Sequence, residues 1–172
     1  MGVAPAANHD AALETDIVTD SGDWPDVADL IGRAAAAAWT AAGDGGRAEV
    51  AVALMDDAAI GRLNAEFRGR KGPTNVLSFP ADDDLVAGPG HDGMLGDIAL
   101  ALETARREAG LEEKTFEDHL CHLVVHGMLH LLGHDHQTPG EAELMEDMER
   151  RILSSLGIAD PYAGQQLDGQ EQ

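Results

Sequence analysis

Six of the eight histidines lie in one segment, HLCHLVVHGMLHLLGHDH, which spans residues 119–136. Its many apolar residues predict a long buried helix from Thr115 to Leu132. His126 and His130 stand four residues apart, so both imidazoles project from one face of this helix. Two neutral imidazoles at that spacing can bind one divalent metal ion, as in the H-E-x-x-H helix of zinc peptidases. The segment therefore predicts a helix that carries part of a metal site.

A glycine in the segment indicates where the third metal ligand lies. Gly133 follows His130 by three residues, and a glycine there can adopt a left-handed conformation and end the helix. The chain would then turn back so that His136 completes a three-histidine site, with the spacing of the metzincin motif. His134 is the alternative third ligand, because it follows His130 by four residues. A helix that breaks at Gly133 moves His134 off the shared face, so we favour His136.

The other residues of the segment bear on the chemistry. His122 and His119 lie one and two turns before His126, where we expect packing or hydrogen bonding rather than metal ligation. Gly127 stands where H-E-x-x-H has its glutamate, and a glycine cannot take a proton from water, which disfavours a metzincin-like zinc peptidase. Three neutral histidines would leave a dipositive ion with an open fourth position, which suits polarisation of a phosphoryl oxygen. We expect one zinc ion per chain, although other divalent transition metals also suit imidazole ligands.

The charge of the chain is strongly acidic but unevenly distributed. The 172 residues include 32 Asp and Glu against 11 Lys and Arg, a net charge of −21 that disfavours nucleic-acid binding. Four of the basic residues nevertheless fall within ten positions: Arg62, Arg68, Arg70 and Lys71. Salt screens charges beyond about 8 Å, so this cluster and a metal ion can form a local site for an anion. A solvated helix end is the plainer interpretation of the cluster.

Composition predicts one globular domain. The chain is 44% hydrophobic, which excludes a disordered acidic tail, and no apolar run reaches the roughly 18 residues of a membrane span. The N-terminus lacks the features of a secretory signal, and the single cysteine, Cys121, allows no internal disulfide. We therefore expect a cytoplasmic protein without membrane association. We expect Trp24, Trp39 and Phe116 to be buried in the core rather than to stack on nucleobases.

Alternation of β-rich and amphipathic segments predicts a small sheet covered by helices on one or both faces, in an α/β or α+β fold. The expected strands are Thr15–Thr19, Glu49–Met55, Thr74–Phe79 and Met94–Leu100, with a loop at residues 81–93. The expected helices are Trp24–Ala42 with Asp23 as a possible N-cap, a second one capped by Asp56 and running through Phe67, Glu103–Ala109, Thr115–Leu132 and Glu141–Leu156. We expect one domain at 13–162, between a flexible N-terminus at 1–12 and a flexible tail at 163–172.

Three stretches of the chain closely resemble the YbeY family of bacterial endoribonucleases, also called rRNA maturation factors. They are LNAEFRGRKGPTNVLSFP (Leu63–Pro80), MLGDIALALETARREA (Met94–Ala109) and the histidine segment, with a looser match in EAELMEDMERRIL. The resemblance implies an α+β fold in which about five helices cover a small mixed sheet of about four strands. It also implies a zinc ion held by His126, His130 and His136, and a catalytic arginine at Arg68.

The same resemblance implies a metal-dependent endoribonuclease specific for single-stranded RNA. It would act in rRNA maturation, including 16S rRNA 3′-end processing, and in ribosome quality control. Its partners would be RNA, chiefly rRNA, and ribosomal proteins or ribosome-associated factors. Arg70 and Lys71 are candidates for substrate binding, and His134 and Asp135 are candidates for proton transfer or for hydrogen bonding near the metal. The general base and the nucleophile stay open, and a non-catalytic, zinc-stabilised ribosome-assembly factor is the main alternative.

Overall fold

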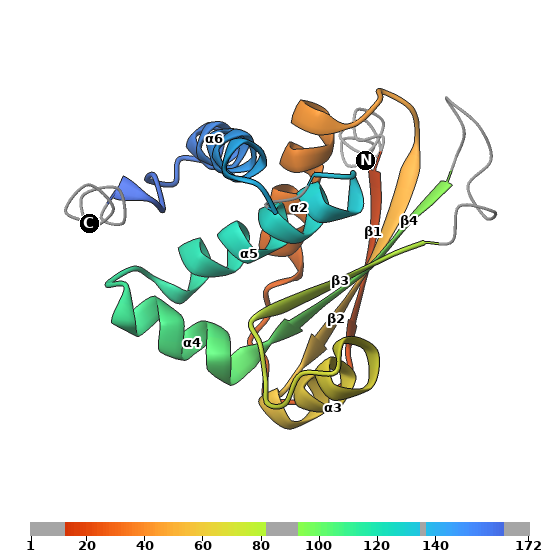
Figure 1. Cartoon of the computed structure of the whole chain (residues 1–172), viewed down its shortest axis with the longest axis vertical. Helices are drawn as coiled ribbons and strands as arrows, with labels where there is room; N and C mark the ends of the chain where they lie inside the picture. Colours follow the sequence, from red (N-terminus) through yellow and green to blue (C-terminus); the bar gives the residue numbers. More distant parts are fainter. Residues whose placement is uncertain (1–12, 82–92, 135–136, 164–172) are drawn as a thin grey trace, which may run out of the picture.

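The computed structural model describes residues 13–81, 93–134 and 137–163. Four strands form one sheet in this part of the chain: β1 (Leu13–Thr19), β2 (Ala48–Met55), β3 (Val76–Pro80) and β4 (Gly93–Ala101). Five helices accompany it: α2 (Ala28–Ala42), α3 (Asp57–Arg68), α4 (Leu102–Leu111), α5 (Phe116–Leu131) and α6 (Pro139–Ser155). Figure 1 shows these helices arranged around the single sheet. The α+β class is therefore confirmed, with four strands and five helices in one small domain of the described residues.

The sheet is mixed, as the resemblance implies. Its strand order is β1-β2-β4-β3. β2 pairs in parallel with β1 and β4, whereas β3 pairs antiparallel with β4. β4 therefore lies inside the sheet, and β3 is an edge strand that pairs only with β4 within the described ranges.

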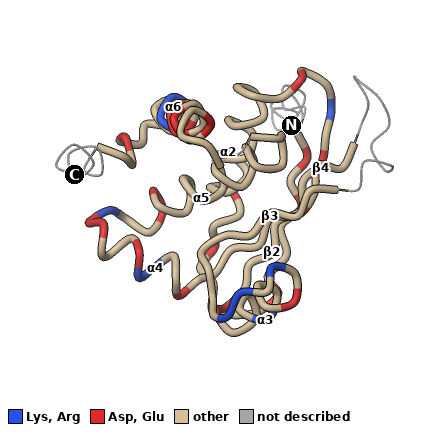
Figure 2. The backbone as a smooth tube through the Cα atoms, viewed as in Figure 1, with Lys and Arg blue, Asp and Glu red and all other residues tan. Residues whose placement is uncertain are grey.

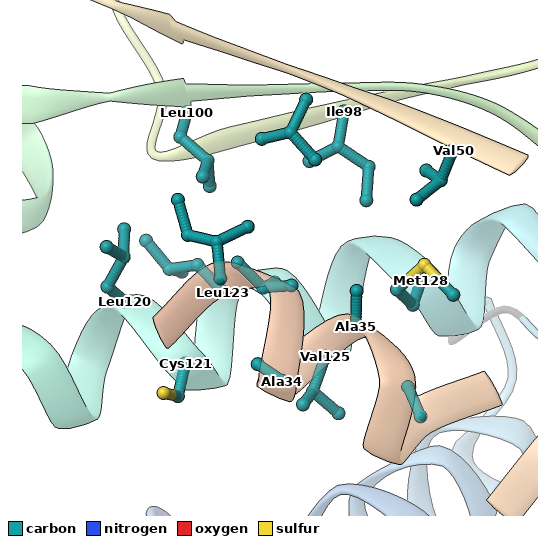
Figure 3. Close-up of a cluster of buried hydrophobic side chains, with 14 of the residues drawn as sticks. Ala34, Ala35, Val50, Ile98, Leu100, Leu120, Cys121, Leu123, Val125 and Met128 are labelled. Atoms are coloured by element: carbon teal, nitrogen blue, oxygen red, sulfur yellow. The ribbon is translucent and has the colours of Figure 1, made fainter. Parts of the chain in front are cut away.

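Alternate residues of β4 pack into two separate hydrophobic clusters. Ile98 and Leu100 belong to the larger cluster, where α2 and α5 cover the sheet. Figure 3 shows both residues, with Val50 of β2, facing side chains of α5 and α2. Ala99 belongs to the smaller cluster with Ile60 of α3, on the opposite face. The larger core thus holds α5 against the sheet, and this packing sets where the histidines of α5 lie.

Local capping explains three helix starts. The Asp56 carboxylate accepts a hydrogen bond from the Ala59 amide at 2.8 Å and begins α3, as predicted. The Thr115 hydroxyl begins α5 in the same way. Thr138 and Glu141 form a reciprocal capping box that begins α6 at Pro139, slightly before the predicted start.

The predicted start of the first helix is wrong. α2 begins at Ala28 rather than at Trp24, and Asp23 does not cap it. The indole Nε1 of Trp24 instead donates to the Met55 carbonyl oxygen at 3.1 Å. Pro25 also disfavours a helical conformation at the residue before it. A tertiary contact with the end of β2 therefore overrides the local helical pattern.

The large apolar residues lie mostly in the core. Trp39 is 7% exposed, so its predicted burial is confirmed. Trp24 and Phe116 are only partly buried and pack against the larger cluster. Within the described ranges, each helix is too short or too polar to span a lipid bilayer.

Gly96 is required where β3 pairs with β4. Its φ of +144° lies in a region that favours glycine, and a Cβ atom there would lie 2.3 Å from the Phe79 carbonyl oxygen. We expect Gly96→Ala to lower the free energy of unfolding by about 2 kcal/mol or more, as measured by urea denaturation. Gly32→Ala in α2 is the control, since no atom lies within 4 Å of the added Cβ, and it should be neutral or stabilising. Equal effects of the two substitutions would contradict the prediction.

Candidate active site

A cavity of about 650 Å³ lies where edge strand β3 meets the C-terminal ends of α3 and α5. Its walls are formed by Arg68, Thr74, Asn75, Val76, Ser78, Pro80, His126, His130, Gly133, His134 and Gln137. Four residues proposed from the sequence therefore meet at one cavity: Arg68, His126, His130 and His134. Arg70 and Lys71 do not line it and are exposed on the turn after α3. Asp135 and His136 lie outside the described residues.

His126 and His130 face the cavity from adjacent turns of α5. Their Nε2 atoms lie 3.1 Å apart, and their ring centroids are 4.6 Å apart. This arrangement directs two imidazole nitrogens toward one point, as binding of a shared ion requires. In the part of the chain that the structure describes, no three His, Cys, Asp or Glu side chains are arranged so that they could hold one metal ion together. A third ligand at His136 therefore stays a prediction.

The end of α5 has the predicted geometry. The helix ends at Leu131, and Gly133 follows with a φ of +98°, in the left-handed region. The backbone N–H of His134 donates to the Leu129 carbonyl oxygen at 2.9 Å and closes the helix end. His134 thus leaves the helix and still lines the cavity.

A buried carboxylate from α6 holds His126 from behind. Glu149 is 0% exposed, and its Oε2 accepts a hydrogen bond from Nδ1 of His126 at 2.6 Å. Its Oε1 accepts from Nε2 of His122 at 3.0 Å and from the hydroxyl of Tyr162. Burial acts to raise the pKa of Glu149, but the hydrogen bonds from both histidines outweigh it and hold this pKa at about 2. Burial and the nearby Glu149 charge raise the pKa of Tyr162, so its hydroxyl remains a donor to an ionised carboxylate.

The Glu149 carboxylate decides which nitrogen of His126 can bind a ligand. An ionised carboxylate only accepts hydrogen bonds, so Nδ1 of His126 carries the hydrogen. In the neutral imidazole, Nε2 then keeps its lone pair, and this is the atom that lies beside Nε2 of His130. Histidines that ligate metals commonly donate their other N–H to a carboxylate. The chemistry of this donor set therefore fits a metal ligand.

The earlier histidines of α5 contact carboxylates behind the cavity wall. His119 is 3% exposed, and its Nε2 lies 2.8 Å from Oε1 of Glu108. Glu108 also accepts a hydrogen bond from Nδ2 of Asn75 at 3.0 Å, and Asn75 lines the cavity. His119 and His122 thus occupy positions of packing and hydrogen bonding, behind two different walls of the cavity.

The role of Glu149 was not predicted from the sequence, although a signal for it exists. Met145, Ile152 and Leu153 of α6 are buried together with Glu149. The spacing of three or four residues places all of them on one helix face, so Glu149 interrupts an apolar stripe. A carboxylate in such a position requires a buried partner. Tyr162 and Asn75 carry no comparable sequence signal, because tertiary packing alone brings them to this region.

Arg68 reaches the cavity from the last turn of α3. Among the described residues that line the cavity, it carries the only permanent positive charge. Figure 2 shows basic residues gathered around α3 and the turn that follows it. A planar guanidinium can bind a phosphate through two parallel hydrogen bonds, which a lysine cannot reproduce. This end of the domain is therefore suited to an anionic ligand.

The surroundings of Gly127 explain why a glutamate is absent there. A Cβ atom at Gly127 would lie 3.2 Å from side-chain atoms of Ile98 and from Oγ of Ser78. Oγ of Ser78 also donates to the Gly127 carbonyl oxygen at 3.2 Å. α5 approaches the sheet so closely here that the side chains of Ile98 and Ser78 would have to shift to admit any Cβ atom, including that of a glutamate. The geometry thus agrees with the sequence argument against a zinc peptidase.

Three imidazoles, a guanidinium and several amide and hydroxyl groups surround one cavity of this α+β domain. Such a set of donors suits a hydrolase site for an anionic substrate. A family model described as Endoribonuclease YbeY matches residues 16–157, which is most of the chain. The chain belongs to this family of RNA-cleaving hydrolases, and the resemblance found in its sequence is confirmed.

Curated relatives named Endoribonuclease YbeY match over most of their length. The relative from Rhodopseudomonas palustris is 53% identical over 161 residues, which cover 91% of this chain and 85% of the relative. The relative from Chelativorans sp. is 54% identical over 155 residues, which cover 88% of this chain and 94% of the relative. The relative from Nitrobacter winogradskyi is 60% identical over 130 residues, which cover 72% of this chain and 68% of the relative.

A solved structure has a similar fold. It is the solution structure of a protein from Thermotoga maritima, which aligns over 92% of this chain and 95% of its own chain. The TM-score is 0.54 and the sequence identity is 24%, so this likeness supports the fold alone.

Proposed function

We propose that this chain is a zinc-dependent endoribonuclease that cleaves single-stranded RNA in rRNA maturation, including 16S rRNA 3′-end processing, and in ribosome quality control. Membership of the endoribonuclease YbeY family supports the activity. The observation that carries the assignment of the site is the common cavity of Arg68, His126 and His130. Arg68, which would bind a phosphate, lines this cavity together with two imidazoles whose Nε2 atoms lie 3.1 Å apart.

His126 and His130 would hold the zinc ion through Nε2, with His136 as the proposed third ligand. Glu149 supports this assignment, because it accepts the hydrogen of Nδ1 of His126 and leaves Nε2 available. When bound there, zinc would supply a Lewis acid that polarises a phosphoryl oxygen.

The residues around the cavity would bind and orient the RNA. Arg68 would hold the non-bridging oxygens of one phosphodiester through two N–H donors and stabilise the charge that develops on them. Arg70 and Lys71 are exposed just outside the cavity and would bind phosphates further along the strand. His134 lines the same cavity and would exchange a proton with the reacting groups.

The acidity of the chain bears on its partners. With a net charge of −21, the protein would repel RNA outside the basic region around α3. A ribosomal protein or a ribosome-associated factor that presents the rRNA would overcome this repulsion. This proposal places the protein in the cytoplasm, where ribosomes mature.

Removal and return of zinc test the proposed activity. The purified protein should contain zinc and cleave an unstructured single-stranded RNA, but not the same sequence in a duplex. Removal of the metal with a chelator should lower the cleavage rate by about 100-fold or more, and added zinc should restore it. Casein should remain uncut by the same preparation, because Gly127 provides no peptidase base. If the zinc-loaded protein supports rRNA maturation but cleaves neither the single-stranded nor the duplex RNA, it would instead act as a non-catalytic, zinc-stabilised ribosome-assembly factor.

A further inference from the structure

Phe67 is the only aromatic residue among the exposed large hydrophobic side chains of the described residues. It lies on the last turn of α3 and is 61% exposed, whereas Trp39 is 7% exposed. Phe79 of β3 packs against it edge to face, with ring centroids 5.5 Å apart and planes inclined by 68°. This contact holds the Phe67 ring in a defined orientation although most of its surface faces solvent.

Phe67 is joined through the backbone to a residue of the proposed active site. The following residue, Arg68, lines the cavity. Ser78 and Pro80, on either side of Phe79, also line it. Because successive side chains of a strand point to opposite faces, Phe79 instead packs against the smaller core cluster beneath α3. The aromatic pair and the cavity therefore lie on opposite faces of edge strand β3. Arg68 connects them, because it follows Phe67 in the chain and lines the cavity.

The charge around Phe67 indicates what would cover it. Exposed basic residues lie near Phe67 in a chain whose net charge is −21: Arg62 on the same helix and Arg70 and Lys71 on the following turn, with Glu66 as the one acidic residue among them. An aromatic ring among cations is typical of surfaces that bind single-stranded nucleic acid, where bases stack on the ring and phosphates contact the cations. An apolar protein surface would leave these cations without partners.

We propose that Phe67 is a stacking platform for one unpaired nucleobase of the RNA, next to the phosphate that Arg68 holds. This proposal rests on the proposed endoribonuclease function and adds to it a subsite outside the cavity. A base in a duplex already has its faces covered by its neighbours, so the platform favours an unpaired strand. It would thus contribute to the preference for single-stranded RNA.

Substitutions that separate aromatic from apolar character test the platform. KM and kcat should be measured with a short unstructured oligoribonucleotide for Phe67→Ala, Phe67→Leu and Phe67→Tyr. We expect Phe67→Ala and Phe67→Leu to raise KM by about 5- to 100-fold with little change in kcat, and Phe67→Tyr to resemble wild type. Leu111→Ala is the control, because Leu111 is 78% exposed at the end of α4 and should leave both constants unchanged. A Phe67→Leu variant that matches wild type would overturn the proposal.

Single abasic nucleotides in the substrate identify the base. At one position near the cleaved bond, loss of the base should raise KM of wild type by the factor seen for Phe67→Ala, and it should have no effect on Phe67→Ala itself. Additive effects at every position would show that Phe67 contacts no base.

Binding of a fluorescent oligonucleotide separates this proposal from the cleavage activity. Single-stranded RNA with 2-aminopurine at that position, or at each position in turn, should lose fluorescence on binding to wild type but not to Phe67→Ala. If wild type quenches the probe without cleaving RNA, the platform stands and the proposed activity fails. If wild type cleaves RNA and the Phe67 variants match it in KM and quenching, the platform fails alone.

Discussion

Replacement of Arg68 with alanine is expected to lower kcat/KM for RNA cleavage by about 100-fold or more while the zinc content stays at the wild-type level. The guanidinium is the only permanent cation that the described part of the chain contributes to the cavity walls, so its removal leaves the charge that develops on the phosphate without that partner. Arg68 is exposed at the end of α3 and has no role in the core, so the variant should fold normally. The measurement is RNA cleavage under single-turnover conditions, with metal analysis of the same sample.

Two further variants decide how Arg68 acts. Arg68→Lys keeps the charge but lacks the two parallel donors, and it should recover only a small part of the rate. Arg33→Ala removes an arginine that pairs with Asp29 on the surface of α2 at 3.1 Å, and it should cleave as wild type does. A purified Arg68→Ala protein with the wild-type cleavage rate would refute the proposed role.

Replacement of Glu149 with glutamine is expected to weaken zinc binding by about 10- to 100-fold. The amide has the shape of the carboxylate but accepts through one oxygen only, so it cannot serve His122, His126 and Tyr162 together. The tautomer of His126 would then no longer be held with its hydrogen on Nδ1. Competition with a chromophoric chelator measures the change in zinc affinity. The ¹⁵N chemical shifts of the His126 ring report its tautomer in the absence of metal.

The same substitution should also destabilise the fold. Loss of the buried charge leaves donors of α5 unsatisfied, and we expect the free energy of unfolding of the zinc-free protein to fall by about 2–4 kcal/mol. Glu143→Gln is the chemically matched control, because Glu143 is exposed on the same helix and should change neither quantity. Unchanged zinc affinity in a destabilised Glu149→Gln variant would limit Glu149 to a structural role.

The expected effects on zinc and on stability come from one physical arrangement. Glu149 is fully buried and joins α6 to α5, so the carboxylate that orients His126 also forms part of the core. Tyr162→Phe separates these contributions, since it removes one donor and keeps the ring. This variant should lower stability less than Glu149→Gln does and should leave His126 bound to the carboxylate.

Local features of the sequence were sufficient for most of the fold and for part of the site. Asp56 predicted the start of α3, because an N-cap acts within three residues of chain, and the apolar run after Thr115 predicted α5. Gly133 predicted the end of α5 for a similarly local reason. The spacing of His126 and His130 placed both imidazoles on one helix face, and the structure brings their Nε2 atoms to within 3.1 Å. Periodicity and capping involve neighbours along the chain, so a sequence read alone determines them.

Tertiary packing decided what surrounds those histidines. α2 begins at Ala28 rather than at the predicted Trp24, because the Trp24 indole donates to the end of β2, which lies far away in the sequence. Packing of α6 on α5 places Glu149 behind His126, and the edge position of β3 opens a cavity in which Arg68 joins the histidines. Packing also leaves the ring of Phe67 exposed. Such contacts join segments that share no local pattern, and they depend on how whole helices and strands bury their apolar faces together.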